Sequence, residues 1–154
     1  LIGSGEATKY RENAGDITVS AGAQGAPIAF AEAGVNPDEI DSAMIYDSFT
    51  ITVAITAEML GLTPPGEGHT LWKDGHAAPG GKFPVNTNGG GLSFNHSGMY
   101  GMPLLVEAYR QLSQTAEDGV HGDKGKQTDA RTCVVNGTGG SLSTTGTLVL
   151  MADD

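Results

Sequence analysis

The sequence predicts an α/β domain built in layers, with a five-stranded mixed sheet and helices on its faces. Short apolar runs of strand length alternate along the chain with longer segments of helical character. The 24 glycines among 154 residues indicate many turns and close backbone contacts. With 38% hydrophobic residues, a chain of this length is expected to form one domain with a core of its own.

The N-terminal part is expected to hold a strand edge and a helix. Residues 1–5 are an apolar start followed by a glycine turn, and residues 16–20 are a possible strand. From Gln24 the pattern predicts a helix, in which Pro27 suits the first turn and Gly34 provides the C-terminal cap.

A short apolar strand is predicted at residues 42–47, followed by a helix at residues 49–60 that Ser48 caps and Gly61 closes. This helix is apolar nearly all round, so we expect it to be buried in the fold. Its β-branched residues leave a strand over residues 51–55 as the alternative.

The middle of the chain is less regular. Residues 63–81 have no periodicity and predict an irregular loop, a possible lid, before a short strand at residues 82–85. Residues 97–114 are the clearest helix. Its expected apolar stripe is Leu104, Leu105, Ala108 and Leu112, and the side chains expected to face water are Glu107, Arg110, Gln111 and Gln114.

Two strands are predicted at the end of the chain, at residues 131–136 and 144–151. The glycine-rich segment 137–143 joins them. Its local sequence is typical of a hairpin turn, although consecutive backbone N–H groups there can also bind a developing oxyanion.

Charge and cysteine content exclude several classes of function. The formal net charge of -10 opposes binding to nucleic-acid phosphates and to anionic lipid surfaces. A single cysteine, Cys133, permits no intrachain disulfide and suits a reducing cytoplasm. We find no signal peptide or membrane span in the sequence, and therefore expect a cytoplasmic protein.

The stretch 86–101 (NTNGGGLSFNHSGMYG) is the strongest candidate for a site. Its glycines allow positive φ angles and a close approach of backbone to ligand, and it brings Asn88, His96 and Tyr100 to one neighbourhood beside a helix N-terminus. His96 can act as an acid, a base or a hydrogen-bond donor, or it can be purely structural.

Other polar residues have weaker functional signals. Tyr46 and Asp47 end a strand, where α/β sheets place ligand contacts, although a tyrosine there is often simply packed. His69 and His76 have no companions at metal-ligand spacing, so we expect no metal site. Cys133 lies in an apolar strand and reads as a small buried hydrophobe.

Several motifs together resemble the thiolase superfamily. Residues 86–91 followed by 95–98 (NHSG) are similar to the thiolase pattern N-x-N-G-G-x-x-x-x-G-H-P-x-G. The segments 46–50 (YDSFT), 84–93 (PVNTNGGGLS) and 105–112 (LVEAYRQL) most resemble the lipid-transfer and sterol-carrier thiolase-like branch. The resemblance covers nearly the whole chain.

The resemblance implies the C-terminal half of a thiolase fold, over residues 1–154, with the N-terminal half that carries the nucleophilic cysteine absent. His96 takes the place of the oxyanion-hole histidine. The second thiolase cysteine falls on Asn136 or Gly137, and neither supplies a thiol. Cys133 lies three to four residues too early for this role.

Some members of this branch resemble aldolases that cleave β-hydroxyacyl-CoA thioesters, often of steroids, without a thiol nucleophile. For this chemistry we expect Tyr46 and Tyr100 to act as base or acid, and His96 with the Gly139 and Gly140 amides to polarise the thioester carbonyl. Asn136 and Asn88 complete the expected loops of the site. The substrate is then acyl-CoA itself, with no further cofactor.

Three hypotheses follow. The chain is half of an acyl-CoA enzyme that makes or breaks a C–C bond, with retro-aldol cleavage favoured over a Claisen-type acetyl-CoA acyltransferase; alone it is expected to be inactive. Alternatively, it is a structural subunit that docks a catalytic partner, or a small-ligand domain that binds an anion. The first requires an N-terminal half or second subunit, and an exposed apolar face to receive it. Thiolase relatives form oligomers.

Overall fold

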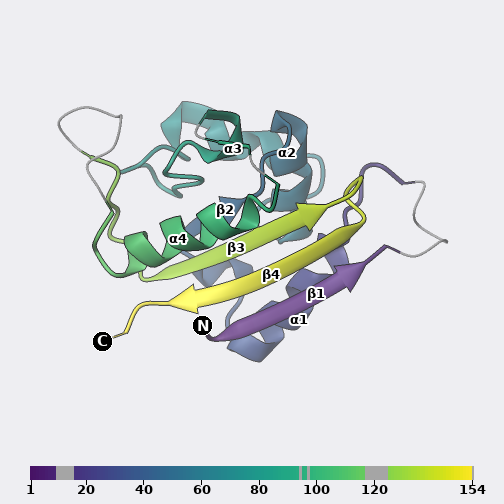
Figure 1. Ribbon diagram of the computed structural model, residues 1–154, viewed down its shortest axis with the longest axis horizontal. Helices are drawn as coiled ribbons and strands as arrows, with labels where there is room; N and C mark the ends of the chain where they lie inside the picture. The colour runs from purple at the N-terminus through teal and green to yellow at the C-terminus, as the bar shows by residue number, and fades with distance from the viewer. Residues whose placement is uncertain (10–15, 94, 97, 117–124, 154) are drawn as a thin grey trace.

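The computed structural model describes residues 1–9, 16–93, 95–96, 98–116 and 125–153. A four-stranded mixed sheet in the order β1-β4-β3-β2 lies between two layers of helices (Figure 1). The strands are β1 (Gly3–Thr8), β2 (Ser42–Ile45), β3 (Thr132–Gly139) and β4 (Thr144–Met151). The β2–β3 pair is parallel, and β4 runs antiparallel to both β3 and β1. The predicted α/β class and mixed sheet are confirmed.

The prediction of five strands is wrong. Residues 16–20 form no strand but contain a turn at residues 17–18, and residues 82–85 contribute only an isolated bridge between Val85 and Ala43. The glycine turn expected within residues 1–5 is also wrong, because Gly3–Thr8 form strand β1. Its polar sequence forms a strand because it pairs with β4 from Gly3 to Thr8. A Cβ atom at Gly5 would collide with the backbone of Gly25, so glycine is required where this strand meets its covering helix.

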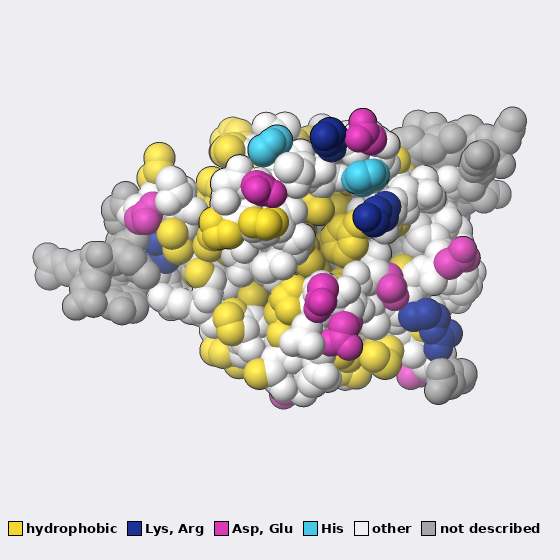
Figure 2. All heavy atoms as spheres, turned by 180° about the vertical axis from the view of Figure 1, so that it is seen from behind, with side chains coloured by type: hydrophobic (Ala, Val, Ile, Leu, Met, Phe, Trp, Pro, Cys, Tyr) yellow, Lys and Arg dark blue, Asp and Glu magenta, His cyan; other side chains and the backbone are white. Residues whose placement is uncertain are grey.

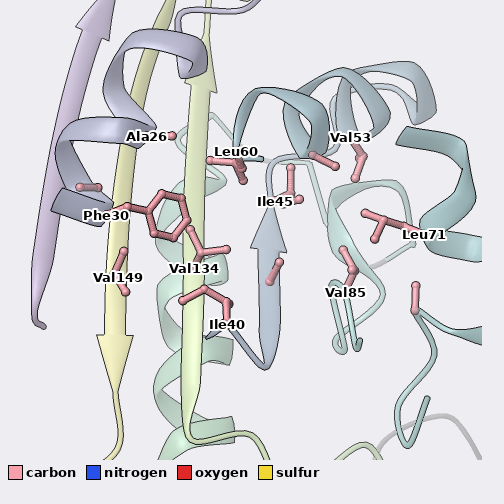
Figure 3. Close-up of a cluster of buried hydrophobic side chains, with 14 residues drawn as sticks. Ala26, Phe30, Ile40, Ile45, Val53, Leu60, Leu71, Val85, Val134 and Val149 are labelled. Carbon is pink, nitrogen blue, oxygen red and sulfur yellow. The ribbon is translucent and has the colours of Figure 1, made fainter. Parts of the chain in front are cut away.

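Helix α1 (Gly22–Ala33) covers one face of the sheet, and Gly34 closes it in the left-handed conformation, as predicted. Pro27 lies inside the helix rather than in its first turn. Helix α2 (Thr50–Met59) confirms the helical prediction for this segment, and the alternative strand is wrong. Both helices share a core with the sheet, in which Phe30, Val134 and Leu60 meet (Figure 3).

Helix α2 is not buried all round. Its buried residues are Thr52, Val53, Thr56 and Ala57, whereas Phe49 beside it and Ile51 are 68% and 61% exposed. The segment 63–81 contains the 3-10 helix η2 (Gly68–Gly75), and its role as a lid stays a prediction. Figure 2 shows the face of the molecule opposite α4, where apolar side chains lie among charged and histidine side chains.

Helix α4 (Gly101–Leu112) covers the other face of the sheet, over β2 and β3. It begins four residues later than predicted, and residue 97 lies outside the described residues. The expectation that Glu107 and Gln111 face water is wrong, because both are buried. The shorter elements are η1 (Pro37–Glu39) and α3 (Gly90–Ser93). Among the described residues, no helix has the length and apolar content needed to cross a membrane.

Candidate active site

Tyr46 and His96 form a hydrogen-bonded pair at the C-terminal end of β2. The Tyr46 backbone N–H donates to the Asn136 carbonyl at 2.9 Å, which continues the parallel pairing and fixes the backbone of this tyrosine. The Tyr46 hydroxyl lies 2.9 Å from Nε2 of His96. Tyr46 is half-buried and His96 is exposed, so the pair is accessible from solvent. Where Nε2 carries no proton, the hydroxyl donates to it.

Tyr100 lies behind this pair. It is fully buried, and its ring contacts that of Tyr46 edge to face with centroids 5.8 Å apart. Its hydroxyl accepts a hydrogen bond from Asn88 Nδ2 at 3.3 Å. Burial raises the pKa of Tyr100, and this effect outweighs the opposing Asn88 hydrogen bond. Tyr100 is therefore a neutral donor or packing group, and Tyr46 is the tyrosine that a ligand can reach.

The glycine-rich loop at residues 86–92 is fixed by side chains that form hydrogen bonds like those between strand backbones. Asn86 exchanges two hydrogen bonds with the backbone of Ile45, through Nδ2 at 2.8 Å and Oδ1 at 2.7 Å, and so extends the sheet beyond β2. Asn88 Oδ1 accepts the Gly90 N–H at 2.9 Å. The loop that carries Asn88 is thus attached directly to the strand that carries Tyr46.

Asp47 holds the other side of the loop. Its buried carboxylate accepts the Gly91 N–H at 2.6 Å and the Leu92 N–H at 3.1 Å. Gly90 has φ +68°, and a Cβ atom there would collide with this carboxylate. The run of glycines is therefore needed because the chain passes tightly over a buried acid.

The hairpin glycines lie beyond the same end of the sheet as Tyr46, because β2 and β3 are parallel and β3 continues from Asn136, the partner of Ile45, to Gly139. Gly139 ends β3, and Gly140 follows in a left-handed conformation with φ +59°. Asn136 is different. Its side chain donates to Thr145 and Thr147 on the α1 side of the sheet, so the structure does not bring its amide to the tyrosines.

Neither position considered for the second thiolase cysteine holds a thiol, and the nearby Cys133 is inaccessible. Burial raises the pKa of the Cys133 thiol to about 12, which keeps it protonated. A Cβ atom at Gly137 would have its nearest neighbour, the Cα of Gly101, at 4.0 Å. There is room for a side chain on the α4 side of the sheet at this position, but the sequence leaves it empty.

A separate cavity of about 520 Å³ lies between α2, η2 and the glycine-rich loop. It is lined mainly by apolar side chains, including Ile51, Trp72 and Leu92, and by His69. In the described part of the chain, no cluster of three or more His, Cys, Asp or Glu side chains is arranged to hold a metal ion.

Residues 3–152 match the family model described as thiolase C-terminal domain-like. This chain belongs to that family. The resemblance inferred from residues 86–98 is therefore confirmed, and the four-stranded half-fold described above is the family's domain.

Two curated relatives of this chain are enzymes, one named a thiolase subunit and the other a lyase. Benzoylsuccinyl-CoA thiolase subunit BbsB of Thauera aromatica is 36% identical over 84 residues, which are 54% of this chain and 22% of the relative. The 17-hydroxy-3-oxo-4-pregnene-20-carboxyl-CoA lyase of Mycobacterium tuberculosis is 36% identical over 93 residues, or 60% of this chain and 24% of the relative. Each match thus covers less than a quarter of the relative's length.

Among solved structures, the Ltp2-ChsH2(DUF35) aldolase superposes with a TM-score of 0.80 and 28% sequence identity. The match covers 98% of this chain and 38% of the aldolase chain. The thiolase C-terminal domain-like chain therefore corresponds to one part of a larger protein in each of these relatives.

Proposed function

We propose that this thiolase C-terminal domain-like chain is half of an enzyme that cleaves a β-hydroxyacyl-CoA thioester by a retro-aldol reaction. The observation that carries the proposal is the hydrogen bond between Tyr46 and His96 Nε2 at an accessible end of the sheet. The lyase and the aldolase among the relatives support it, because their names describe lyase and aldol chemistry rather than acyl transfer.

The tyrosine and histidine can move one proton in both directions. The Tyr46 oxygen takes the proton of the substrate's β-hydroxyl while the tyrosine's own proton passes to His96 Nε2. The β-oxygen then becomes the carbonyl oxygen of an aldehyde or ketone as the bond between the α and β carbons breaks, and the electron pair of that bond becomes the enolate of the thioester. Tyr46 then protonates the α carbon while His96 Nε2 returns its proton to the Tyr46 oxygen, so both side chains regain their starting state and the reaction consumes no co-reactant.

The enolate oxygen requires hydrogen-bond donors. We assign this role to backbone N–H groups of Gly139 and Gly140, which lie at the same end of the sheet as Tyr46. Tyr100 holds the Tyr46 ring from behind and stays neutral because burial raises its pKa.

A Claisen-type acyl transfer is the second candidate, because one relative is named a thiolase subunit. Its nucleophile would come from outside this chain, since Cys133 is buried with a pKa raised to about 12. The two reactions are distinguished by free CoA, which a thiolytic cleavage consumes and a retro-aldol cleavage does not use. The test is mass spectrometry of the products that the complete protein forms from a β-hydroxyacyl-CoA without added CoA and, separately, from a β-ketoacyl-CoA with free CoA. We expect an aldehyde or ketone and a shortened acyl-CoA from the β-hydroxyacyl-CoA; cleavage of the β-ketoacyl-CoA alone, with consumption of free CoA, would favour the Claisen reaction.

We further propose that the missing half packs on the outer face of α4. Three apolar side chains of this helix, Met102, Val106 and Tyr109, are exposed at i, i+4 and i+7 spacing, an arrangement typical of a helix that is covered by a partner. The 38% coverage of the aldolase chain supports a second half of the fold.

Replacing Val106 with serine should destabilise the complete protein by about 1–3 kcal/mol, because a hydroxyl would be buried without a partner. The matched control is Ile28→Ser on α1, where Ile28 is 55% exposed on the other side of the sheet. Chemical denaturation measures both. Equal stability of the two variants would show that the face of α4 stays in water.

A further inference from the structure

A buried ion pair joins Glu107 on α4 to Lys126, which follows this helix in the chain. It has no role in the reaction proposed above. Lys126 Nζ donates to Glu107 Oε2 at 2.7 Å, and both side chains are almost fully buried. Burial raises the pKa of a carboxyl group, but the hydrogen bonds from Lys126, Thr87 and Gln111 outweigh that effect and lower the pKa of Glu107. Glu107 is therefore a buried anion that accepts hydrogen bonds from three side chains.

The second oxygen of Glu107 holds the glycine-rich loop. Thr87, which is fully buried, donates its hydroxyl to Glu107 Oε1 at 2.6 Å. Gln111 Nε2 donates to the Thr87 oxygen at 3.0 Å and to the Lys126 carbonyl at 2.9 Å. The threonine hydroxyl thus has both a donor and an acceptor, which fixes its rotamer.

Thr87 is followed directly by Asn88, whose amide donates to the Tyr100 hydroxyl at 3.3 Å. The Tyr100 ring in turn contacts the ring of Tyr46 edge to face. A continuous set of contacts therefore runs from the Lys126–Glu107 pair, through Thr87 and Asn88, to the two tyrosines.

We propose that Thr87, fixed by the buried Lys126–Glu107 pair, is a positioning residue that sets the orientation of Asn88 and the tyrosine pair. This inference rests on the proposed function for its kinetic consequence. Its structural part concerns the loop alone, because Asn88 Oδ1 also accepts the Gly90 N–H. A displaced Asn88 should therefore loosen the loop as well as shift Tyr100.

The test compares Thr87→Val with Thr87→Ser in the complete protein. Valine keeps the shape and loses the hydroxyl, whereas serine keeps the hydroxyl. We expect Thr87→Val to lower kcat roughly tenfold with little change in KM, and Thr87→Ser to retain most of the wild-type kcat. The control is Thr56→Val on α2, since Thr56 is equally buried but its hydroxyl has no hydrogen-bond partner. That substitution should leave kcat unchanged.

Two further readouts separate positioning from a general loss of stability. Combining Thr87→Val with Asn88→Ala should cost less than the product of the two single effects, because both act on one contact path. Hydrogen–deuterium exchange of peptides spanning residues 88–92 should be faster in Thr87→Val and unchanged in Thr87→Ser.

Three outcomes would overturn the proposal: multiplicative kinetic effects in the double variant, equal impairment of kcat by serine and valine, or wild-type exchange in Thr87→Val. If the wild-type protein has no retro-aldol activity, the exchange result alone decides it, so the two proposals fail separately.

Discussion

Replacing Tyr46 with phenylalanine in the complete protein is expected to reduce turnover by roughly 10²- to 10⁴-fold, the usual contribution of a general acid or base. The variant keeps the aromatic contacts with His96 and Tyr100 and removes only the hydroxyl that lies 2.9 Å from Nε2. Binding of acyl-CoA should be nearly unchanged. Steady-state kinetics and calorimetric binding separate the two quantities.

The comparison variant is Tyr100→Phe, for which we expect a smaller loss of turnover. Tyr100 is fully buried, and its hydroxyl meets Asn88 rather than solvent. Because burial raises its pKa above the ordinary value of 10.0, ionisation of Tyr100 should produce no change in rate below that pH. Wild-type turnover in both phenylalanine variants would rule out tyrosine-based chemistry.

Lys126→Met is expected to destabilise the protein by about 3–5 kcal/mol at neutral pH, because it leaves the Glu107 carboxylate buried without its cation. The matched control is Lys82→Met, which removes an exposed lysine and should change stability by no more than about 0.5 kcal/mol. Chemical denaturation of the two variants and the wild type measures the difference. A loss for Lys126→Met as small as that of the control would show that solvent compensates the charge.

The effect of Lys126→Met should depend on pH in a defined direction. The folded protein holds the pKa of Glu107 below its ordinary value of 4.5, so the stabilisation is complete above that pH. It is lost as the pH falls through the lowered pKa of the folded state. The difference between wild type and Lys126→Met should therefore shrink below pH 4.5. A double variant, Glu107→Leu with Lys126→Met, should recover much of the stability at neutral pH.

Most of the fold was predictable because its signals are local. The β-branched run of β4 gave its bounds correctly, and Gly34 marked the end of α1. The strand β1 was only partly predictable, since its polar sequence is held by pairing with β4. The short segment before Asn86 has strand-like residues but makes a single bridge, because the chain turns away there to form the loop.

The buried polar network was missed although the sequence carried a signal for it. Leu104, Glu107, Ala108 and Gln111 have i, i+3, i+4, i+7 spacing and are the buried residues of α4. The polar side chains of Glu107 and Gln111 suggested an exposed face. Lys126, which compensates the buried charge of Glu107, is distant in sequence. Tyr46, His96 and Tyr100, which the motifs singled out, lie together in the structure, and their catalytic roles stay a prediction. The motifs did not distinguish the accessible tyrosine from the buried one, because that depends on packing beneath α4.

The contact between the substrate's β-hydroxyl and Tyr46 decides the proposed reaction. It is tested most directly by a crystal structure of the complete protein with a β-hydroxyacyl-CoA analogue whose thioester is replaced by an amide, which resists enolate formation. We predict the β-oxygen within about 2.6–3.2 Å of the Tyr46 hydroxyl and the carbonyl oxygen toward Gly139 and Gly140. A β-oxygen bound away from Tyr46, for example in the cavity lined by Trp72 and Leu92, would rule out Tyr46 as the base.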